Sequence, residues 1–114
     1  MISERNQVLF RLKLHHIGIV VKNIQESLGE LTKFLNFEST AVPTLVGSQK
    51  VNVCFLKTNN VFIELIEPAE ENSPISVFTA NGGGFHHICF EVDDIQKEIG
   101  KMVKNGARII VKPV

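Results

Sequence analysis

Hydrophobic and polar residues alternate along this chain with two different periods, which predict its helices and strands. Apolar residues recur every three or four positions over 24–35 and 95–104, the spacing of one face of a helix. The residues that flank these segments are typical helix caps: Asn23 and Asp94 before them, Asn36 and Gly106 after them. We therefore expect two helices with these bounds.

Segments rich in β-branched and aromatic residues predict the strands. Residues 50–57 and 60–66 are of this kind, and the polar residues between them favour a hairpin turn. We expect further strands near 37–42 and 107–111, and a short helix near 75–80.

The chain contains an internal repeat. The segment from Leu14 to Gln25 recurs without a gap from Phe85 to Gln96, and seven of sixteen aligned positions over the full repeat are identical. The sequence therefore predicts two copies of one supersecondary module. The first is a βαβββ module over about 12–67, followed by a linker with a short helix over 68–84. The second, over 85–114, stops before its last two strands.

The composition describes an ordinary globular protein. A chain of 114 residues is enough for one domain, and twelve basic residues balance twelve acidic ones, so nothing favours nucleic acid or a membrane surface. Residues 1–7 lack the apolar core of a signal peptide, and no apolar run has the length of a membrane span. We expect a single cytoplasmic domain, 1–114, that binds neither nucleic acid nor membrane.

Both cysteines lie inside apolar, strand-like runs. Cys54 lies between Val53 and Phe55, and Cys89 between Ile88 and Phe90. Such cysteines favour small packed side chains over a disulfide. Cys89 is a possible exception, because it shares an alternation face with His87.

Each copy of the repeat begins with two adjacent histidines, which face opposite sides of a strand because side chains alternate. His15 and His86 belong to the apolar sets expected to pack under the helices, where they would hydrogen-bond or pack. His16 and His87 face the other side at equivalent positions of the two copies.

Glu64 is a single carboxylate in an apolar run from Val61 to Ile66. A buried unpaired carboxylate lowers the stability of the fold by roughly several kcal/mol, so it needs a partner. A metal held by His16, Glu64 and His87 would supply one, and this donor set suits zinc, iron, cobalt, nickel or manganese with positions left open for a substrate oxygen. The structural alternative makes the histidines packing residues and Glu64 a salt-bridged carboxylate. The equivalence of the two histidines favours the metal. Glu91 is a weaker candidate that can instead reach solvent.

At these residues the sequence resembles the vicinal-oxygen-chelate (glyoxalase/bleomycin resistance/dioxygenase) superfamily, and within it the methylmalonyl-CoA epimerases. The resemblance covers about residues 12–114 and is carried by the segments 14–21, 62–68, 72–75 and 82–95. It implies an α+β fold in which paired βαβββ modules form a concave, incomplete barrel around a divalent metal. His16, Glu64 and His87 match three of the four positions of the family's metal site. The fourth, a Glu on the final strand that also acts as catalytic base, would lie beyond Val114, so no catalytic residue is assigned.

The resemblance also implies the chemistry. It predicts a metal-dependent isomerase that removes the proton next to the thioester carbonyl of a small acyl-CoA, through an enolate stabilised by the metal. The alternatives are another glyoxalase-type isomerase, lyase or dioxygenase reaction, and a non-catalytic domain that binds a small molecule. The unfinished second module would expose strand edges and apolar surface, so we expect a homodimer or strands supplied by another subunit.

Overall fold

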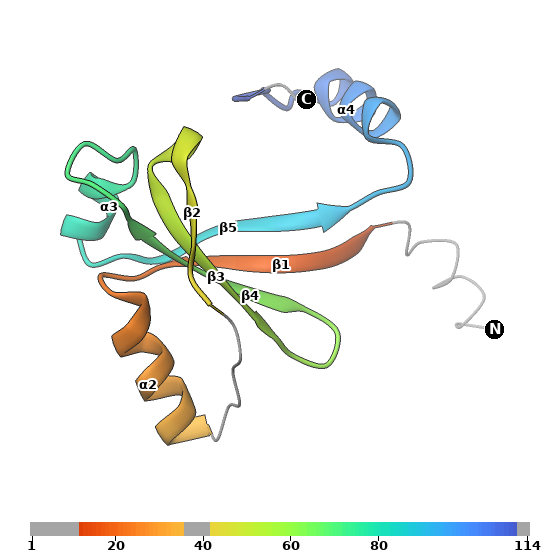
Figure 1. The fold of residues 1–114 in the computed structure, drawn as a ribbon. Helices are drawn as coiled ribbons and strands as arrows, with labels where there is room; N and C mark the ends of the chain where they lie inside the picture. Colours follow the sequence, from red (N-terminus) through yellow and green to blue (C-terminus); the bar gives the residue numbers. More distant parts are fainter. Residues whose placement is uncertain (1–11, 36–41, 112–114) are drawn as a thin grey trace. The chain divides into compact units, whose positions relative to one another are not determined.

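The structure, a computed structural model, describes residues 12–35 and 42–111. In chain order the elements are β1 (Lys13–Val20), α2 (Ile24–Leu35), β2 (Thr44–Val46), the 3-10 turn η1 (Gly47–Gln49), β3 (Val51–Lys57), β4 (Phe62–Pro68), α3 (Ser76–Ala80), β5 (Gly84–Glu91) and α4 (Ile95–Lys104) (Figure 1). They fall into two compact units. One is Leu14–Cys89, and the other contains the described residues 12–13 and 90–111.

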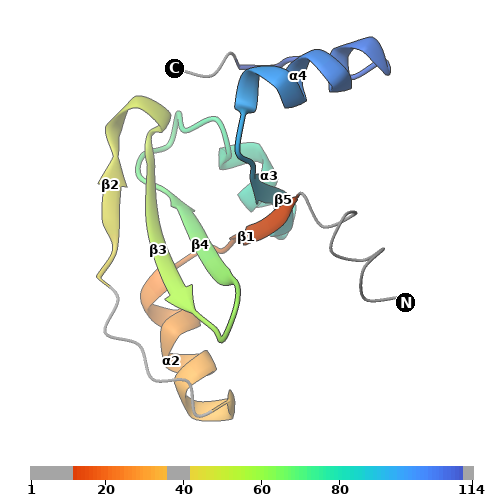
Figure 2. The same ribbon diagram turned by 90° about the vertical axis from the view of Figure 1, so that its right-hand side faces the viewer.

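The strands form one open, mixed sheet with the order β2-β3-β4-β1-β5. The β2–β3 and β3–β4 pairs are antiparallel, and Figure 2 shows these three strands side by side. The β1–β4 pair is parallel and places Gly18 opposite Glu64. The sheet does not close on itself. This confirms the predicted α+β fold with an incomplete barrel, and β1, α2, β2, β3 and β4 give the expected βαβββ order.

Both long helices have the predicted bounds, because the predicted N-cap residues form capping hydrogen bonds. The Asn23 side-chain oxygen accepts a hydrogen bond from the backbone N–H of Glu26 at 2.9 Å, and Asp94 accepts one from Lys97 at 3.1 Å. After α4, Gly106 adopts a φ of 96°, as expected for a residue that ends a helix. Asn36, the predicted end of α2, lies outside the described residues.

Two hydrophobic clusters form the core of the Leu14–Cys89 unit. One contains Ile24 of α2 with Cys54, Leu56 and Leu65, and the partly buried Ile19 and Val21 pack against it. The other contains Val20 with Val51, Val53, Ile66 and Ile75. Neighbouring residues of β1 and the turn after it therefore enter different clusters, as side-chain alternation predicts. Cys54 is buried in this core, as predicted, whereas Cys89 is partly exposed.

Two predicted strands need comment. The prediction of a strand at 107–111 is wrong. These residues form no strand, and Ile110 and Val111 are each 83% exposed. Their β-branched composition gives the propensity, but a strand also needs a neighbour for its hydrogen bonds. The strand expected near 37–42 falls mainly on residues 36–41, outside those described. The strand observed before the hairpin is β2.

The remaining elements agree with expectation within two residues at each end. The hairpin of β3 and β4 closes over the polar turn, where the backbone N–H of Thr58 donates to the carbonyl of Val61 at 3.0 Å. Among the described residues, no helix has the length and apolar character needed to cross a membrane. That the chain acts as a single domain stays a prediction.

Candidate metal centre

Three adjacent strands supply the residues of the predicted site. His16 lies on β1, Glu64 on β4 and His87 on β5, and β1 lies between the other two strands in the sheet. Because β1 and β4 are parallel with Gly18 opposite Glu64, the side chains of His16 and Glu64 project from the same face. The fold thus brings together residues that are far apart in the sequence.

The ligand atoms of the three side chains converge. Nε2 of His87 is 3.1 Å from Oε1 of Glu64, and Nε2 of His16 is 3.4 Å from the same oxygen. The two Nε2 atoms are 3.1 Å apart. Each side chain therefore presents one donor atom to a common point, and the three predicted residues are neighbours in the structure. That they bind a metal stays a prediction.

The triangle of donor atoms has the dimensions of a metal site. Two atoms that each bind one ion at about 2.1 Å are separated by about 3.0 Å at a right angle and by about 3.4 Å at the tetrahedral angle. The three separations, 3.1, 3.1 and 3.4 Å, lie within or close to this interval. The donor set, two imidazoles and one carboxylate, also suits a first-row divalent metal. The residues therefore fit such an ion without rearrangement.

Burial sets the charge state of the site. The side chains of His16 and Glu64 are 12% and 13% exposed, whereas His87 is 36% exposed. Burial is the main cause that lowers the pKa of His16, and the neighbouring His87 and His15 lower it further. Burial also raises the pKa of Glu64, although the histidines around it act in the opposite direction. Burial thus favours the neutral form of His16 and opposes the ionised form of Glu64.

Gly18 makes room for one of the histidines. A Cβ atom on Gly18 would overlap the imidazole of His87, lying 2.5 Å from Nδ1 and 2.8 Å from Nε2. Only a residue without a side chain lets the ring of His87 lie against β1. Sequence reasoning did not identify Gly18, although a glycine inside a strand is a known sign of close approach.

A second glycine positions β5. Gly83 has a φ of 67°, and a Cβ atom there would lie 2.5 Å from the carbonyl oxygen of Val20. The chain can therefore pass closely over the end of β1 before it enters β5. This approach places His87 beside His16.

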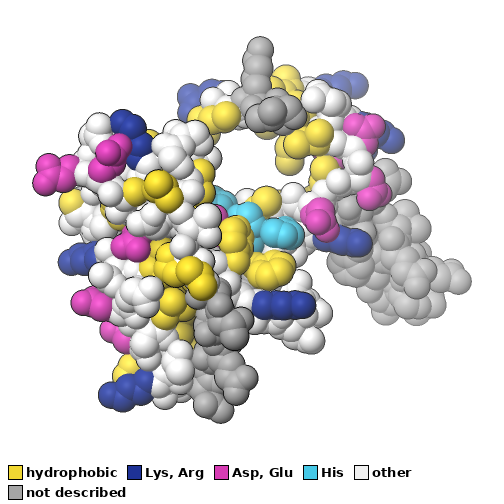
Figure 3. All heavy atoms as spheres, in the orientation of Figure 1, with side chains coloured by type: hydrophobic (Ala, Val, Ile, Leu, Met, Phe, Trp, Pro, Cys, Tyr) yellow, Lys and Arg dark blue, Asp and Glu magenta, His cyan; other side chains and the backbone are white. Residues whose placement is uncertain are grey.

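The outer histidines contact the inner ones. Nδ1 of His15 is 2.8 Å from Nδ1 of His16, and Nδ1 of His86 is 2.8 Å from Nδ1 of His87. The ring of His86 also packs against Phe78 of α3. His86 packs beside a helix as predicted, whereas His15 packs on Phe62 of β4. The predicted burial of the second apolar set is wrong, because His86, Ile88 and Phe90 are exposed. Figure 3 shows histidine side chains at the surface with hydrophobic side chains beside them.

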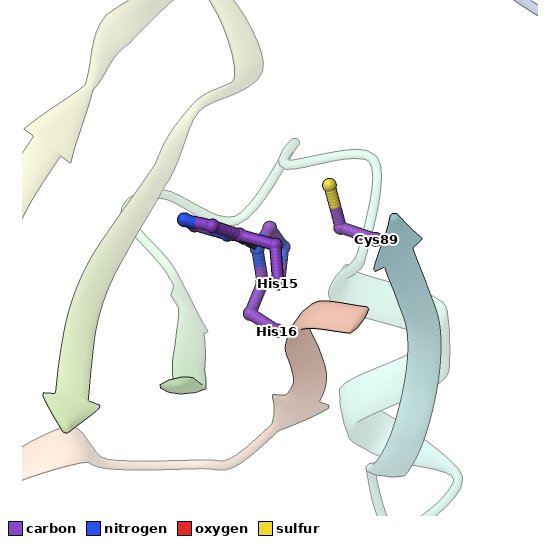
Figure 4. A group of neighbouring side chains, drawn as sticks. All are labelled: His15, His16 and Cys89. Atoms are coloured by element: carbon purple, nitrogen blue, oxygen red, sulfur yellow. Dashed lines mark hydrogen bonds between the residues drawn. The ribbon is translucent and has the colours of Figure 1, made fainter. Parts of the chain in front are cut away.

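Two further candidates have different outcomes. Cys89 lies near His15 and His16, and one donor atom from each of the three lies within 4.8 Å of the others (Figure 4). The expectation that Cys89 differs from Cys54 is therefore supported, since Cys54 is buried in the core. Glu91 is exposed at the end of β5, in agreement with the solvent alternative.

Known proteins resemble this chain over most of its length. A profile of the Glyoxalase/Bleomycin resistance protein/Dioxygenase superfamily matches residues 15–114. The chain is 36% identical over 100 residues to the mitochondrial methylmalonyl-CoA epimerase of Dictyostelium discoideum, covering 86% of this chain and 60% of that protein. It is 34% identical to the ethylmalonyl-CoA/methylmalonyl-CoA epimerase of Cereibacter sphaeroides, covering 86% of this chain and 74% of that protein.

A solved structure gives the same picture. The methylmalonyl-CoA epimerase of Streptomyces coelicolor, in complex with 2-nitronate-propionyl-CoA, is 25% identical and superposes with a TM-score of 0.78, covering 88% of this chain and 76% of that one. The present chain spans less than two thirds of the Dictyostelium protein.

Proposed function

Because this chain belongs to the glyoxalase/bleomycin resistance protein/dioxygenase superfamily, we propose that it is an epimerase of a malonyl-CoA thioester with a short α-substituent, and that it uses a divalent metal bound by His16, Glu64 and His87. The convergence of the three donor atoms is the observation that supports the proposed metal site. The similarity to epimerases named for methylmalonyl-CoA and ethylmalonyl-CoA supports the substrate class.

The chain's own residues prepare the site for a cation. Burial lowers the pKa of His16 and so favours its neutral form, in which one ring nitrogen has an electron pair that can bind a cation. The ring of Phe55 packs edge-on against His16, with the ring centroids 5.3 Å apart. Glu64 brings the negative charge that a divalent cation requires. The same distances allow an Nε2–H of either histidine to donate to Oε1 of Glu64. When both Nε2 atoms are unprotonated, a cation between the three donor atoms would supply the positive charge that balances the carboxylate.

The site accounts for the reaction in outline. Removal of the proton next to a thioester carbonyl leaves a negative charge on the carbonyl oxygen, and a bound cation would stabilise that charge. Three protein donors leave coordination positions for substrate oxygens. His16, Glu64 and His87 then act as binding residues that orient the acyl group, while the acid and base remain unassigned.

Elemental analysis tests the metal site. We expect the purified wild-type chain, reconstituted with Co²⁺, Zn²⁺, Mn²⁺, Ni²⁺ or Fe²⁺, to bind about one ion per chain, and His16→Ala and His87→Ala to lose it. A matched control is Lys57→Ala, an exposed position at the end of β3. Absence of metal in the reconstituted wild type would refute the site.

Proton exchange tests the reaction. We expect the metal-loaded protein to exchange the α-proton of methylmalonyl-CoA with deuterated water, and the metal-free protein to be at least about 100-fold slower, as expected when a charge-stabilising group is removed. Exchange at equal rates in both forms would contradict the role of the metal. Absence of exchange, with metal bound, would contradict the epimerase assignment alone.

We also propose that the protein is a homodimer. In the unit that contains α4, the apolar residues Ile95, Met102 and Val103 are each about half exposed, and Ile110 and Val111 are exposed still further. Burial of such surface against a second copy would stabilise the assembly. Sedimentation velocity should give twice the mass of one chain. A single monomeric species at micromolar concentration would contradict this.

A further inference from the structure

The two site histidines make the same pair of contacts. His16 and His87 both direct Nε2 towards Glu64, and both have Nδ1 at 2.8 Å from Nδ1 of the histidine that precedes them. The ring centroids within each pair are 5.1 Å apart in both copies. This arrangement therefore occurs twice, once in each copy of the internal repeat.

The chemistry of imidazole determines which histidine of each pair donates the hydrogen bond. A neutral imidazole carries one N–H, and the other nitrogen has the electron pair that can bind a cation. If Nε2 of His16 is the donor atom of the site, its proton must be on Nδ1. That N–H then donates to Nδ1 of His15, whose own proton must be on Nε2. The same reasoning applies to His87 and His86.

We propose that His15 and His86 are positioning residues that accept the Nδ1–H of His16 and His87 and so fix Nε2 as the atom presented to the site. A hydrogen bond to the second nitrogen of a metal-binding histidine sets its tautomer and ring orientation, and it raises its basicity. The effect on metal affinity rests on the function proposed above. The tautomers can be measured by NMR with diamagnetic Zn²⁺ bound, independently of any enzyme activity.

The outer rings are themselves held in place. The ring of His15 packs on Phe62 of β4, and that of His86 packs on Phe78 of α3, with centroids 5.3 Å apart in both cases. Each inner histidine is therefore backed by a histidine, and each outer histidine by a phenylalanine. Such support restricts the rotation of the inner ring and keeps its Nε2 directed at Glu64.

Cys89 suggests a competing explanation, because its thiol lies near His15 and His16 and the three could form a separate soft-metal site (Figure 4). The repeat argues against this. Gly18, which has no side chain, is the counterpart of Cys89 in the repeat, yet the His86–His87 pair has the same Nδ1–Nδ1 separation as the His15–His16 pair. The contact between adjacent histidines therefore does not depend on a thiol.

Nitrogen NMR of the imidazole rings measures the tautomers directly. The chain has four histidines, so ¹⁵N-histidine labelling gives four ring systems, each assignable with one His→Asn variant. With diamagnetic Zn²⁺ bound at neutral pH, we expect the proton of His16 and His87 on Nδ1, and the proton of His15 and His86 on Nε2. A proton on Nδ1 of His15 or His86 in this state would overturn their accepting role. The proton of His16 and His87 on Nε2 in this state would overturn the proposal.

Substitution of the outer histidines gives a second test. His15→Leu removes the acceptor at similar size, whereas His15→Asn keeps a side-chain oxygen near the position of Nδ1. We expect the leucine variant to bind Co²⁺ about 10- to 100-fold more weakly, the range typical of such supporting contacts, and the asparagine variant to stay near wild type. His86→Leu and His86→Asn should behave in the same way.

The outcomes separate the explanations. Equal affinity in the leucine variants and wild type would overturn the proposal. So would a stoichiometry of two ions that falls to one in both His15→Leu and Cys89→Ala, because this would make His15 a ligand. If the leucine variants bind Co²⁺ more weakly but the metal-loaded wild type exchanges no α-proton, the epimerase assignment fails and the positioning role stands. If the leucine variants do not fold, the spectra of the wild-type protein still decide the question.

Discussion

The imidazole of His87 occupies the space in which a side chain of Gly18 would lie, although the two residues belong to different copies of the repeat. The strand that carries one site histidine is therefore shaped to receive the other. This relationship makes the geometry of the site depend on a residue that has no functional group.

Substitution of this glycine should disturb the site. In Gly18→Ala, the Cβ atom would displace the ring of His87, so we expect Co²⁺ affinity to fall at least about tenfold, comparable to the loss of a supporting contact. Isothermal titration calorimetry measures it. The control is Gly29→Ala in α2, where a Cβ atom meets no other group within 4 Å. This control should keep its affinity and gain about 1 kcal/mol of stability. Unchanged affinity in Gly18→Ala would show that the ring can move without cost.

Removal of the charge on Glu64 should have opposite effects on folding and on metal binding. Burial raises the pKa of Glu64 above its ordinary value of 4.5, so the metal-free folded state disfavours the ionised form. Its cost to stability therefore grows as the pH rises from 4.5 through the folded-state pKa. At pH 7.5, in a chelator, Glu64→Gln should melt a few degrees above wild type, while its metal affinity should fall by more than about 100-fold.

Differential scanning fluorimetry and metal titration measure these two quantities. Glu67→Gln, on the same strand, is a suitable control because it changes charge outside the site. A melting temperature of Glu64→Gln below that of wild type in the chelator would mean that the carboxylate stabilises the metal-free protein.

The pH dependence of stability should reflect His16. Its folded-state pKa lies below the ordinary value of 6.5, so the unfolded chain takes up a proton at this residue before the folded protein does. The stability contributed by neutral His16 is present above pH 6.5 and is lost as the pH falls through 6.5 towards the folded-state pKa.

The measurement compares metal-free wild type with His16→Asn. We expect the melting temperature of wild type to fall more steeply than that of the variant as the pH is lowered from 7.5 to below 6.5. Parallel curves for the two proteins would contradict this assignment. Such a result would leave His86, whose pKa is also lowered mainly by burial, as the titrating group.

The core cluster beside α2 should depend on Ile24. This side chain is fully buried and packs with Cys54, Leu56 and Leu65, so Ile24→Ala should lower the free energy of unfolding by about 2–5 kcal/mol. Leu35→Ala, at a position of the same helix that is 66% exposed, should change it by less than about 0.5 kcal/mol. Urea denaturation distinguishes the two. Equal effects would mean that the first turn of α2 is not part of the core.

The helices and the site could be predicted because their signals are local or repeated. Asn23 and Asp94 cap their helices, and apolar spacing defined the segments between the caps. His16 and His87 were identified by alternation within each strand and by their equivalence in the repeat. Glu64 was identified because a lone carboxylate in an apolar run is costly.

The features that were missed depend on tertiary contacts. The role of Gly18 arises only when β5 lies beside β1, and the contact between Nδ1 atoms of adjacent histidines depends on side-chain rotation. The strand predicted at 107–111 failed for a related reason. Residues such as Ile110 have the right composition, but strand formation requires a partner that composition does not reveal.

Gly82, Gly83 and Gly84 all have positive φ values, and this has a consequence for the entropy of assembly. Glycine loses more conformational freedom on ordering than any other residue. Gly82 and Gly83 lie just before β5, which carries His87, and Gly84 is the first residue of that strand. Ordering of this glycine segment therefore costs more entropy per residue than ordering of a segment of other residues. An ion that joins His87 to His16 would offset this cost, so completion of the site and immobilisation of the glycine segment become one cooperative event.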